Sequence, residues 1–277
     1  NVMCSPLSGV CCDEKFDSTP YALATAKFFL RNPMAQSLPR KFKFNFTCCE
    51  KHGMVRMVDV GLIPEIQQID GSEQKGFKIF LGGGLGNKSF VGHQLEDFTP
   101  EDDLLYTSIA VVRIFDRLGD RKNLARNRMR YLVNDMGWEK FQNLVLKERA
   151  IVRATQSVVT RLRVNTAPDQ IKRPLKITDE SGNSAPDGYA RWLKTNTVKQ
   201  KQPEYHSVFI TLEAGDITSN QLNALAELVR EFSSEGKART GFVQNVALRY
   251  VHEDDLIPLY SKLLQSGLAK SGALTMT

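Results

Sequence analysis

Phenylalanine alternates with polar residues in a short segment of the first half of the chain. Phe42, Phe44 and Phe46 occupy every second position, and Lys41 and Lys43 alternate with them. Successive side chains of a strand point to opposite faces of a sheet, so this pattern predicts a strand with one aromatic face and one cationic face. We expect Lys41 and Lys43 to point the same way.

Other hydrophobic patterns predict the elements around this strand. Apolar residues at helical spacing favour a helix over 21–30, and Pro33 ends it. A polar turn that contains Gly71 separates two apolar stretches and indicates a pair of strands. The further elements predicted for this part are strands at 54–63 and 76–81 and helices at 101–118, 123–132 and 137–150.

The pattern changes in the second half of the chain. Residues 166–204 are rich in Pro, Asp, Asn, Lys and Gly, which is typical of a long ordered loop or linker. Beyond it, a strand near Val208, a capped helix to about Phe232, a strand over 242–250 and a helix over 254–266 form one β-α-β-α half of a ferredoxin-like layout. The predicted architecture is α+β: a mixed-sheet unit at 1–165, a linker at 166–204 and a ferredoxin-like half-domain at 205–277.

Composition indicates the class of the protein and the sign of the charge on its partner. The 277 residues are 42% apolar and 25% charged, enough to form a core in each of two domains. The net charge of +6 favours an anionic partner without separating nucleic acid, acidic cofactor and acidic protein. Because no apolar run reaches about 18 residues and no signal-peptide pattern is present, we expect a cytoplasmic protein without membrane contact. Asn1 is not a natural initiator, so the chain is expected to be cut from a longer protein.

Three basic or glycine-rich segments carry the candidate chemistry. They are LPRKFK at 38–43, GFKIFLGGGLG at 76–86 and GDRKNLARNRMRY at 119–131. Lys41 and Lys43 could concentrate a small anion and donate protons to it, or could form a merely exposed strand face. The guanidinium groups of the third segment could bind carboxylates, face solvent or contact nucleic acid, although aromatic residues do not interleave with its charges.

The glycine run at 82–84 follows an apolar strand, as a phosphate-binding turn would. Its spacing does not fit a dinucleotide site, and no Gly-Lys-Ser or Gly-Lys-Thr follows it. A structural turn and close packing against a planar ligand are the two remaining interpretations.

The cysteines and histidines give no metal-binding spacing. The five cysteines are odd in number and include the adjacent pairs 11–12 and 48–49, which favours reduced thiols over a disulfide framework. Adjacent pairs are not the spaced thiolates that bind an iron–sulfur cluster, so we expect buried thiols. The four histidines are scattered, and the sequence predicts no metal ligands.

Together with NVMCSPLSGVCCDEKFD at 1–17 and RTGFVQN at 239–245, the three segments resemble the siroheme-dependent nitrite and sulfite reductases over nearly the whole chain. The resemblance implies a duplicated protein whose halves each contain a ferredoxin-like unit and a larger α+β unit, with siroheme and a 4Fe-4S cluster between the halves. This chain would be the middle of such a protein. The first ferredoxin-like unit and the four cysteines that bind the cluster would then lie in N- and C-terminal units outside it.

The resemblance also implies roles for single residues. Lys41 and Lys43 match the lysines that bind the anion and supply protons, and Arg40 is placed to reach a siroheme carboxylate. The other matches to siroheme-binding positions are Gly82, Gly83, Gly84 and Leu85 along the macrocycle, Arg121, Asn123 and Arg128 near its carboxylates, and Arg239, Gln244 and Asn245 in the second unit.

The expected function is the six-electron reduction of sulfite or nitrite by the parent protein, with ferredoxin as the electron donor and no nucleic-acid partner. The chain alone is expected to be inactive. Two alternatives stay open: an enzyme of corrinoid synthesis that acts on a tetrapyrrole with the same scaffold, and a non-catalytic module that binds nucleic acid or another acidic partner.

Overall fold

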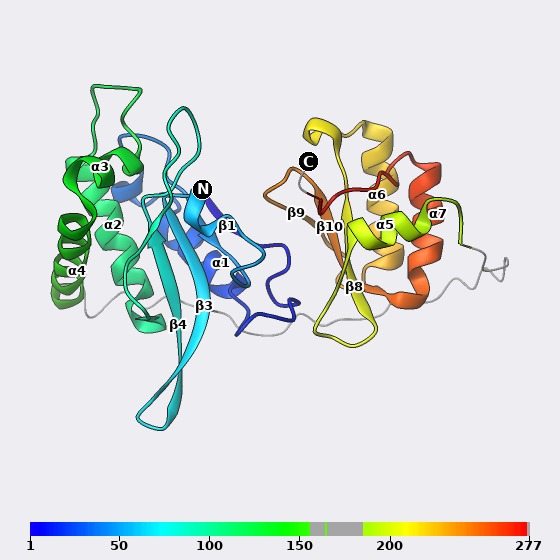
Figure 1. Ribbon diagram of the computed structural model, residues 1–277, viewed down its shortest axis with the longest axis horizontal. Coiled ribbons are helices and arrows are strands. Elements are labelled where there is room, and N and C mark those ends of the chain that lie inside the picture. The colour runs from blue at the N-terminus through cyan, green and yellow to red at the C-terminus, as the bar shows by residue number, and fades with distance from the viewer. Residues whose placement is uncertain (156–163, 165–184, 276–277) are drawn as a thin grey trace. The chain divides into compact units, whose positions relative to one another are not determined.

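The computed structural model describes residues 1–155, 164 and 185–275, which fold as two compact units (Figure 1). The first unit contains residues 1–9 and 13–166, and the second contains Val10–Cys12 and 167–277. Each unit has its own sheet and its own hydrophobic core. The predicted α+β fold class is confirmed.

The first unit is built on a mixed six-stranded sheet. Three parallel strands come first in the order β1, β2 and β3, and β4 then runs antiparallel to β3 and pairs with both β5 and β6. The parallel strands bring the N-terminus beside the phenylalanine segment. The strands are β1 (Val2–Cys4), β2 (Phe44–Phe46), β3 (Val60–Ile69), β4 (Ser72–Leu81), β5 (His93–Gln94) and β6 (Thr99–Pro100).

The long hairpin of β3 and β4 turns at Asp70 and Gly71, within the polar turn predicted around Gly71. The strands continue closer to this turn than the predicted ranges 54–63 and 76–81, and β3 begins only at Val60. Both residues have positive φ, 52° and 78°, which is the backbone of a two-residue turn that matches the twist of antiparallel strands. Ile69 pairs with Ser72 directly before and after this turn. In Figure 1 the hairpin extends beyond the rest of the first unit.

Helices supply the remaining core of the first unit. Phe46, Phe77, Phe115 and Phe141 are all fully buried there, so the predicted aromatic face of the strand packs against helical side chains. The helices are α1 (Thr19–Phe29), α2 (Leu104–Leu118), α3 (Met129–Met136) and α4 (Trp138–Thr155), with short 3-10 turns η1 (Pro33–Ala35), η2 (Val55–Met57) and η3 (Glu101–Asp103).

The prediction of a helix over 123–132 is wrong for most of the basic segment. The helix α3 begins only at Met129. The Asp120 carboxylate accepts hydrogen bonds from the backbone N–H groups of Lys122 and Asn123, and Asn123 Oδ1 accepts one from the N–H of Ala125. These local side-chain bonds replace the helical ones, which is why Asp and Asn favour turns over helices.

The second unit contains the predicted ferredoxin-like half-domain. Its four strands are antiparallel in the order β7-β8-β10-β9, and α6 and α7 lie on one side of them in Figure 1. The elements are α5 (Tyr189–Asn196), β7 (Thr197–Lys199), β8 (Tyr205–Ile210), η4 (Glu213–Gly215), α6 (Ser219–Phe232), β9 (Ala238–Thr240), β10 (Val246–His252), η5 (Glu253–Asp255) and α7 (Leu256–Gln265).

The range 166–204, predicted as a linker, contains regular structure in its described part. Both α5 and β7 lie there, and β7 adds an edge strand to the sheet of the second unit. Trp192 of α5 is fully buried in that unit's core. Tyr189 and Leu193 of the same helix pack against that core as well, so apolar contacts hold a segment whose polar composition is otherwise typical of a loop.

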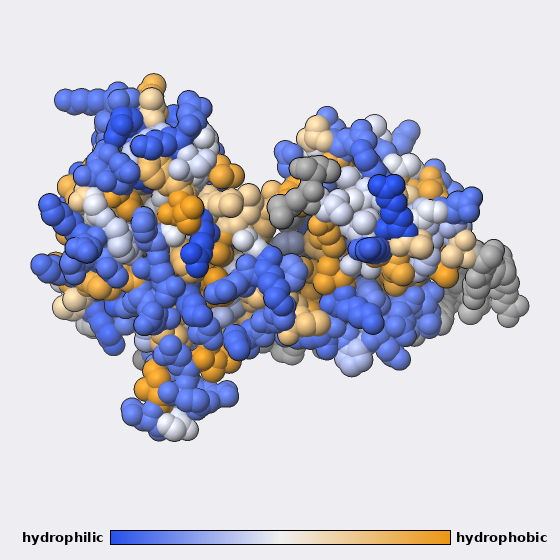
Figure 2. Space-filling model, in the orientation of Figure 1, coloured by the Kyte–Doolittle hydropathy of each residue, from blue (hydrophilic) through white to orange (hydrophobic). Residues whose placement is uncertain are grey.

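Among the described residues, no helix combines the length and the apolar character needed to cross a membrane. On the face drawn in Figure 2, each unit carries many hydrophilic side chains with smaller hydrophobic areas between them.

A buried carboxylate joins two strands of the second unit. The side chain of Glu235 has no exposed surface, and its two oxygens accept hydrogen bonds from Arg239 and Arg249 at 2.7–3.1 Å. Burial by itself would raise the pKa of Glu235, but the two guanidinium groups outweigh it and lower that pKa to about 2. The ionised carboxylate therefore stabilises the folded unit.

Replacing Glu235 should change the acid stability of this unit. A depressed folded-state pKa gives stabilisation that is complete above the ordinary value of 4.5 and is lost as the pH falls toward about 2. We expect Glu235→Gln to lower the free energy of unfolding near neutral pH by on the order of 3 kcal/mol and to flatten its decline below pH 4.5.

Tryptophan fluorescence can follow the second unit alone. The chain has two tryptophans, so Trp138→Phe leaves only the buried Trp192 as reporter during acid and urea unfolding. The exposed Glu227 of α6 provides the matched control, Glu227→Gln. Identical acid profiles for the two glutamine variants would contradict the assignment.

Candidate functional site

The segment that carries the two candidate lysines has the predicted alternation only in part. Phe42 and Phe44 are buried, while Lys41 is exposed and Lys43 is half-buried. The strand β2 covers only Phe44–Phe46, so both lysines precede its first residue in the chain. Asn45, the next polar position, is completely buried, and its amide atoms find no hydrogen-bond partner in the described part of the chain.

Asp59 connects this segment to the other two candidate segments. One carboxylate oxygen accepts a hydrogen bond from the backbone N–H of Lys43 at 3.0 Å, and both oxygens accept from Arg128 at 2.9 and 3.1 Å. The carbonyl oxygen of Asp59 accepts from the N–H of Gly82 at 3.0 Å. Its side chain has no exposed surface, so burial raises the pKa of Asp59 while the Arg128 guanidinium opposes that rise. The sequence analysis did not single out this aspartate.

Two more hydrogen bonds join the basic segment to the first segment. Arg121 donates to the carbonyl oxygen of Ser37 at 2.6 Å, and Asn127 donates to that of Pro39 at 3.3 Å. Gly119 lies so close that an added Cβ would be 2.7 Å from Pro39. The basic loop is therefore packed onto LPRKFK, and folding brings together the segments that the sequence separates.

Several predicted cofactor-binding residues already have protein partners. Arg121 also forms an ion pair with Asp116 at 2.7 Å, and Arg128 binds Asp59. Asn123 shapes its own turn. These bonds position the loop, and contact of these side chains with a cofactor stays a prediction.

The glycine turn is filled by the protein's own groups. An added Cβ would be 2.9 Å from Val133 at Gly82 and 2.2 Å from the carbonyl oxygen of Arg56 at Gly83. Gly82 also has a φ of 82°, which favours glycine. Leu85, directly after the turn, is 52% exposed. Chain packing thus accounts for the first two glycines, as the structural interpretation of the run predicted.

Arg130 is a cation that the sequence analysis did not assign. It is only 7% exposed, and an added Cβ at Gly84 would lie 2.9 Å from its Nη1. Its guanidinium lies 4.8 Å from the centroid of the Tyr131 ring. Nε and Nη1 of Arg130 are buried and have no hydrogen-bond partner among the described residues. A buried guanidinium in this state is suited to bind a carboxylate.

A groove of about 530 Å³ opens beside the lysine segment. Arg40 and Lys41 line it together with Lys27 and Arg31, and no Asp or Glu side chain contributes to its walls. Its apolar residues include Phe29 of α1, Phe44 of β2 and Val112 of α2. Across the described ranges, Arg40, Lys41 and Lys43 form no ion pair, so their charges are not neutralised by the described carboxylates.

The predicted residues of the second unit have structural roles. Arg239 binds the buried Glu235. Asn245 accepts a hydrogen bond from the N–H of Leu212 and donates one to the carbonyl oxygen of Ala273, so it links the end of β8 to the C-terminal segment. Gln244 is exposed and has a φ of 61°. Whether these three contact siroheme remains a prediction.

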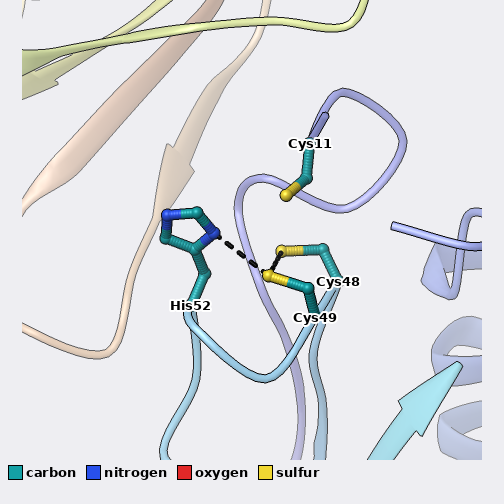
Figure 3. A group of neighbouring side chains, drawn as sticks. All are labelled: Cys11, Cys48, Cys49 and His52. Carbon is teal, nitrogen blue, oxygen red and sulfur yellow. Dashed lines mark hydrogen bonds between the residues drawn. The ribbon is translucent and has the colours of Figure 1, made fainter. Parts of the chain in front are cut away.

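Three cysteines and one histidine come together elsewhere in the structure, a grouping that their spacing in the sequence did not predict. Cys11, Cys48, Cys49 and His52 place one sulfur or ring nitrogen each within 4.8 Å of one another (Figure 3). In the sequence, the only sign of this group was that His52 lies close to the 48–49 cysteine pair. Cys11 is far from them in the chain and joins the group only in the folded structure.

Replacing Asp59 should destabilise the first unit. Asp59→Asn leaves the Arg128 guanidinium, whose side chain is 16% exposed, without its charged partner, and we expect a cost of up to roughly 3–5 kcal/mol, the range for fully buried pairs. Native-state hydrogen exchange of amides in β3 and β4 measures this loss. Asp135→Asn is the control, because it breaks an arginine pair in which both side chains are about half exposed and should cost about 1 kcal/mol or less. Equal effects of the two substitutions would contradict this role.

Comparisons with known proteins agree with the order of the two units. The family described as nitrite and sulphite reductase 4Fe-4S domain matches residues 1–152, and the nitrite/sulfite reductase ferredoxin-like half domain matches residues 198–266.

The relatives are longer than this chain. The assimilatory ferredoxin-dependent nitrite reductase of Haloferax mediterranei is 26% identical over 270 residues, which cover 95% of this chain and 43% of that protein. Sulfite reductase (ferredoxin) 1 of Mycolicibacterium paratuberculosis is 26% identical over 267 residues, covering 95% of this chain and 42% of that protein. The chain thus spans less than half the length of these relatives.

The fold is also that of a solved structure. The NirA protein of Mycobacterium tuberculosis superposes with a TM-score of 0.70 at 22% identity, over 98% of this chain and 44% of that one. At 22% identity this superposition shows the fold alone, and the family is shown by the matches over 1–152 and 198–266. The chain belongs to the nitrite and sulfite reductase family.

Proposed function

We propose that this chain is the central part of an enzyme that reduces nitrite or sulfite by six electrons, and that its first unit binds the anion and part of the siroheme. The observation that carries the proposal is the set of cations around Asp59. Arg40, Lys41 and Lys43 lie on the segment that Asp59 holds, and Arg130 lies against the glycine turn that Asp59 also binds. The described residues form no ion pair with these four cations. Such a surface is suited to an anionic ligand.

Siroheme and a 4Fe-4S cluster are the cofactors of this family. Siroheme carries eight carboxylates and, when bound, supplies the iron centre for reduction of the anion. The residues present fit it, because Arg130 has buried N–H groups without a partner and the groove has four cationic side chains on an apolar lining. Arg130 and Arg40 would each hold a siroheme carboxylate.

The cysteines of this chain do not fit the 4Fe-4S cluster. A cluster of this kind takes four cysteine thiolates, each on a different iron, which keeps the sulfurs apart. The group at Cys48 contains only three thiols, and all its ligand atoms lie within 4.8 Å. The ligands of the cluster therefore belong to the parts of the parent protein outside this chain.

The two lysines would act on the anion directly. An ammonium group is a compact charge with three N–H donors, so a pair of them binds an oxyanion and holds protons near its oxygens. Each oxygen that leaves as water takes up two protons, and a positioned ammonium lowers the barrier by supplying one. The hydrogen bond from the Lys43 N–H to Asp59 fixes the backbone from which both side chains extend.

Ferredoxin is the proposed electron donor. Several relatives carry ferredoxin in their names, among them a nitrite reductase of Haloferax mediterranei and a chloroplast nitrite reductase of Oryza sativa subsp. japonica. Identity to them is 26% and 25%.

Substitution of either lysine should disable turnover and spare the fold. In the full-length, siroheme-loaded enzyme, we expect Lys41→Met or Lys43→Met to lower kcat/KM by at least on the order of 100-fold, the lower end of what a positioned proton donor contributes. The assay measures reduction of nitrite and of sulfite with reduced ferredoxin. Lys140→Met, at an exposed position of α4, should leave the rate unchanged. An enzyme that reduces neither anion would refute the proposed function.

Substitution of Arg130 should weaken siroheme binding. Loss of a charged hydrogen-bond donor costs about 1.5–3 kcal/mol, so we expect Arg130→Gln to retain siroheme roughly 10- to 100-fold less tightly. Siroheme absorbance per protein chain and the rate of cofactor loss on dilution measure this, and circular dichroism checks the fold. Arg126→Gln is the control, because Arg126 is about half exposed and pairs with Asp135. Equal retention by both variants would contradict the role of Arg130.

A further inference from the structure

We propose that Cys48, Cys49 and His52, with Cys11 as the fourth ligand, bind a single zinc ion. The donor set of three thiolates and one imidazole is the Cys3His set of structural zinc sites. This site is separate from the anion-binding surface and from the cluster ligands outside the chain.

The distances fit one tetrahedral ion. With Zn–S bonds of about 2.3 Å, neighbouring sulfurs of a tetrahedral site lie about 3.8 Å apart. The sulfurs of Cys48 and Cys49 are 4.0 Å apart, and Cys49 Sγ lies 3.2 Å from His52 Nδ1. All four ligand atoms lie within 4.8 Å, and in Figure 3 the three sulfurs and the imidazole face one another. Small rotations of these side chains suffice to place an ion between them.

The loop that carries three of the ligands is held by its own chain. Thr47 is fully buried, and its hydroxyl lies 3.1 Å from the carbonyl oxygen of Cys49 and 2.7 Å from that of His52, so it can donate to either. Gly53 permits this contact, because an added Cβ there would be 2.4 Å from the Thr47 hydroxyl. The turn at 47–53 is therefore preformed, which keeps Cys49 and His52 on one side of it.

A further hydrogen bond supports the sulfur of Cys48. The hydroxyl of Ser5 lies 3.6 Å from Cys48 Sγ, and the Ser5 N–H donates to the carbonyl oxygen of Phe46 at 2.8 Å. Ser5 is thus fixed on the end of β2 and can donate a hydrogen bond to a thiolate. Groups of this kind around a metal orient its ligands and raise its affinity.

Cys11 is close in sequence to residues of the first unit. It lies in the short stretch Val10–Cys12, whose neighbours Gly9 and Asp13 both belong to the first unit. Asp13 forms an ion pair with Lys51 of the ligand loop at 2.9 Å. The chain two residues after Cys11 is therefore attached to the loop that carries Cys49 and His52. Cys11 and Cys48 are buried, as ligands of a structural ion are.

A structural ion here would fix the end of β2. The ligands at 48–52 directly follow the strand that carries the phenylalanines, and Lys41 and Lys43 lie at its other end. Zinc would therefore stabilise the first unit and would take no part in electron transfer, since it has no redox chemistry.

Metal content of the chain provides the first test. The 277-residue chain is purified under reducing conditions without chelator, and zinc, iron and sulfide are measured per chain. We expect one zinc, a loss of thermal stability on removal by a chelator, and its recovery on adding zinc. A zinc-free chain that does not gain thermal stability from added zinc overturns the proposal, as does a chain that holds iron and sulfide in its place.

Cobalt titration identifies the ligands on the metal-free chain. Tetrahedral Co²⁺ bound by thiolates gives sulfur-to-metal charge-transfer bands, which we expect for the unaltered chain and not for Cys49→Ser or His52→Asn. Ser5→Ala should weaken the affinity roughly tenfold. Cys12→Ser, an exposed cysteine next to Cys11, is the matched control and should keep the bands. Absence of these bands from the unaltered reduced chain, or their persistence in Cys49→Ser, overturns the assignment and needs no siroheme or activity measurement.

Discussion

A single buried carboxylate holds the candidate site together. Asp59 has no exposed surface, yet it binds the Lys43 backbone, the Arg128 guanidinium and, through its carbonyl, the glycine turn at Gly82. A charge placed in such surroundings is costly unless it is paired and fully hydrogen-bonded, so the three partners cannot move independently. The geometry of the lysine segment depends on this constraint more than on the strand itself, which covers only Phe44–Phe46.

The presence or absence of a carboxylate partner separates the basic residues into two groups. Arg121, Arg128 and Arg239 pair with carboxylates of the chain and build the fold. Lys41 and Arg130 have no such partner in the described residues, and Arg130 is buried as well. Cations without an ion-pair partner attract an approaching anion more than the paired arginines do, so the net charge of +6 alone does not tell which basic residues can bind a ligand.

The cysteine group gives the first unit a second fixed point. Asp59 holds one end of the phenylalanine segment, and the turn at 47–53 holds the other through the Thr47 hydroxyl. Side chains that bind a charged ligand work best when the elements beneath them are rigid. Both fixed points are made of buried polar atoms whose partners come from distant parts of the sequence.

The sequence by itself determined the class of fold, the turn at Gly71, the buried phenylalanines and the family, because these depend on local periodicity, turn chemistry and contiguous motifs. It failed at 123–128, where side-chain hydrogen bonds displace the helix, and at 189–199, where Trp192 anchors a polar segment. Only the tertiary structure decided which arginines are paired, that Asp59 joins three segments, and that Cys11 meets Cys48, Cys49 and His52. Those facts depend on burial and on contacts between residues far apart in the chain, which no local pattern encodes.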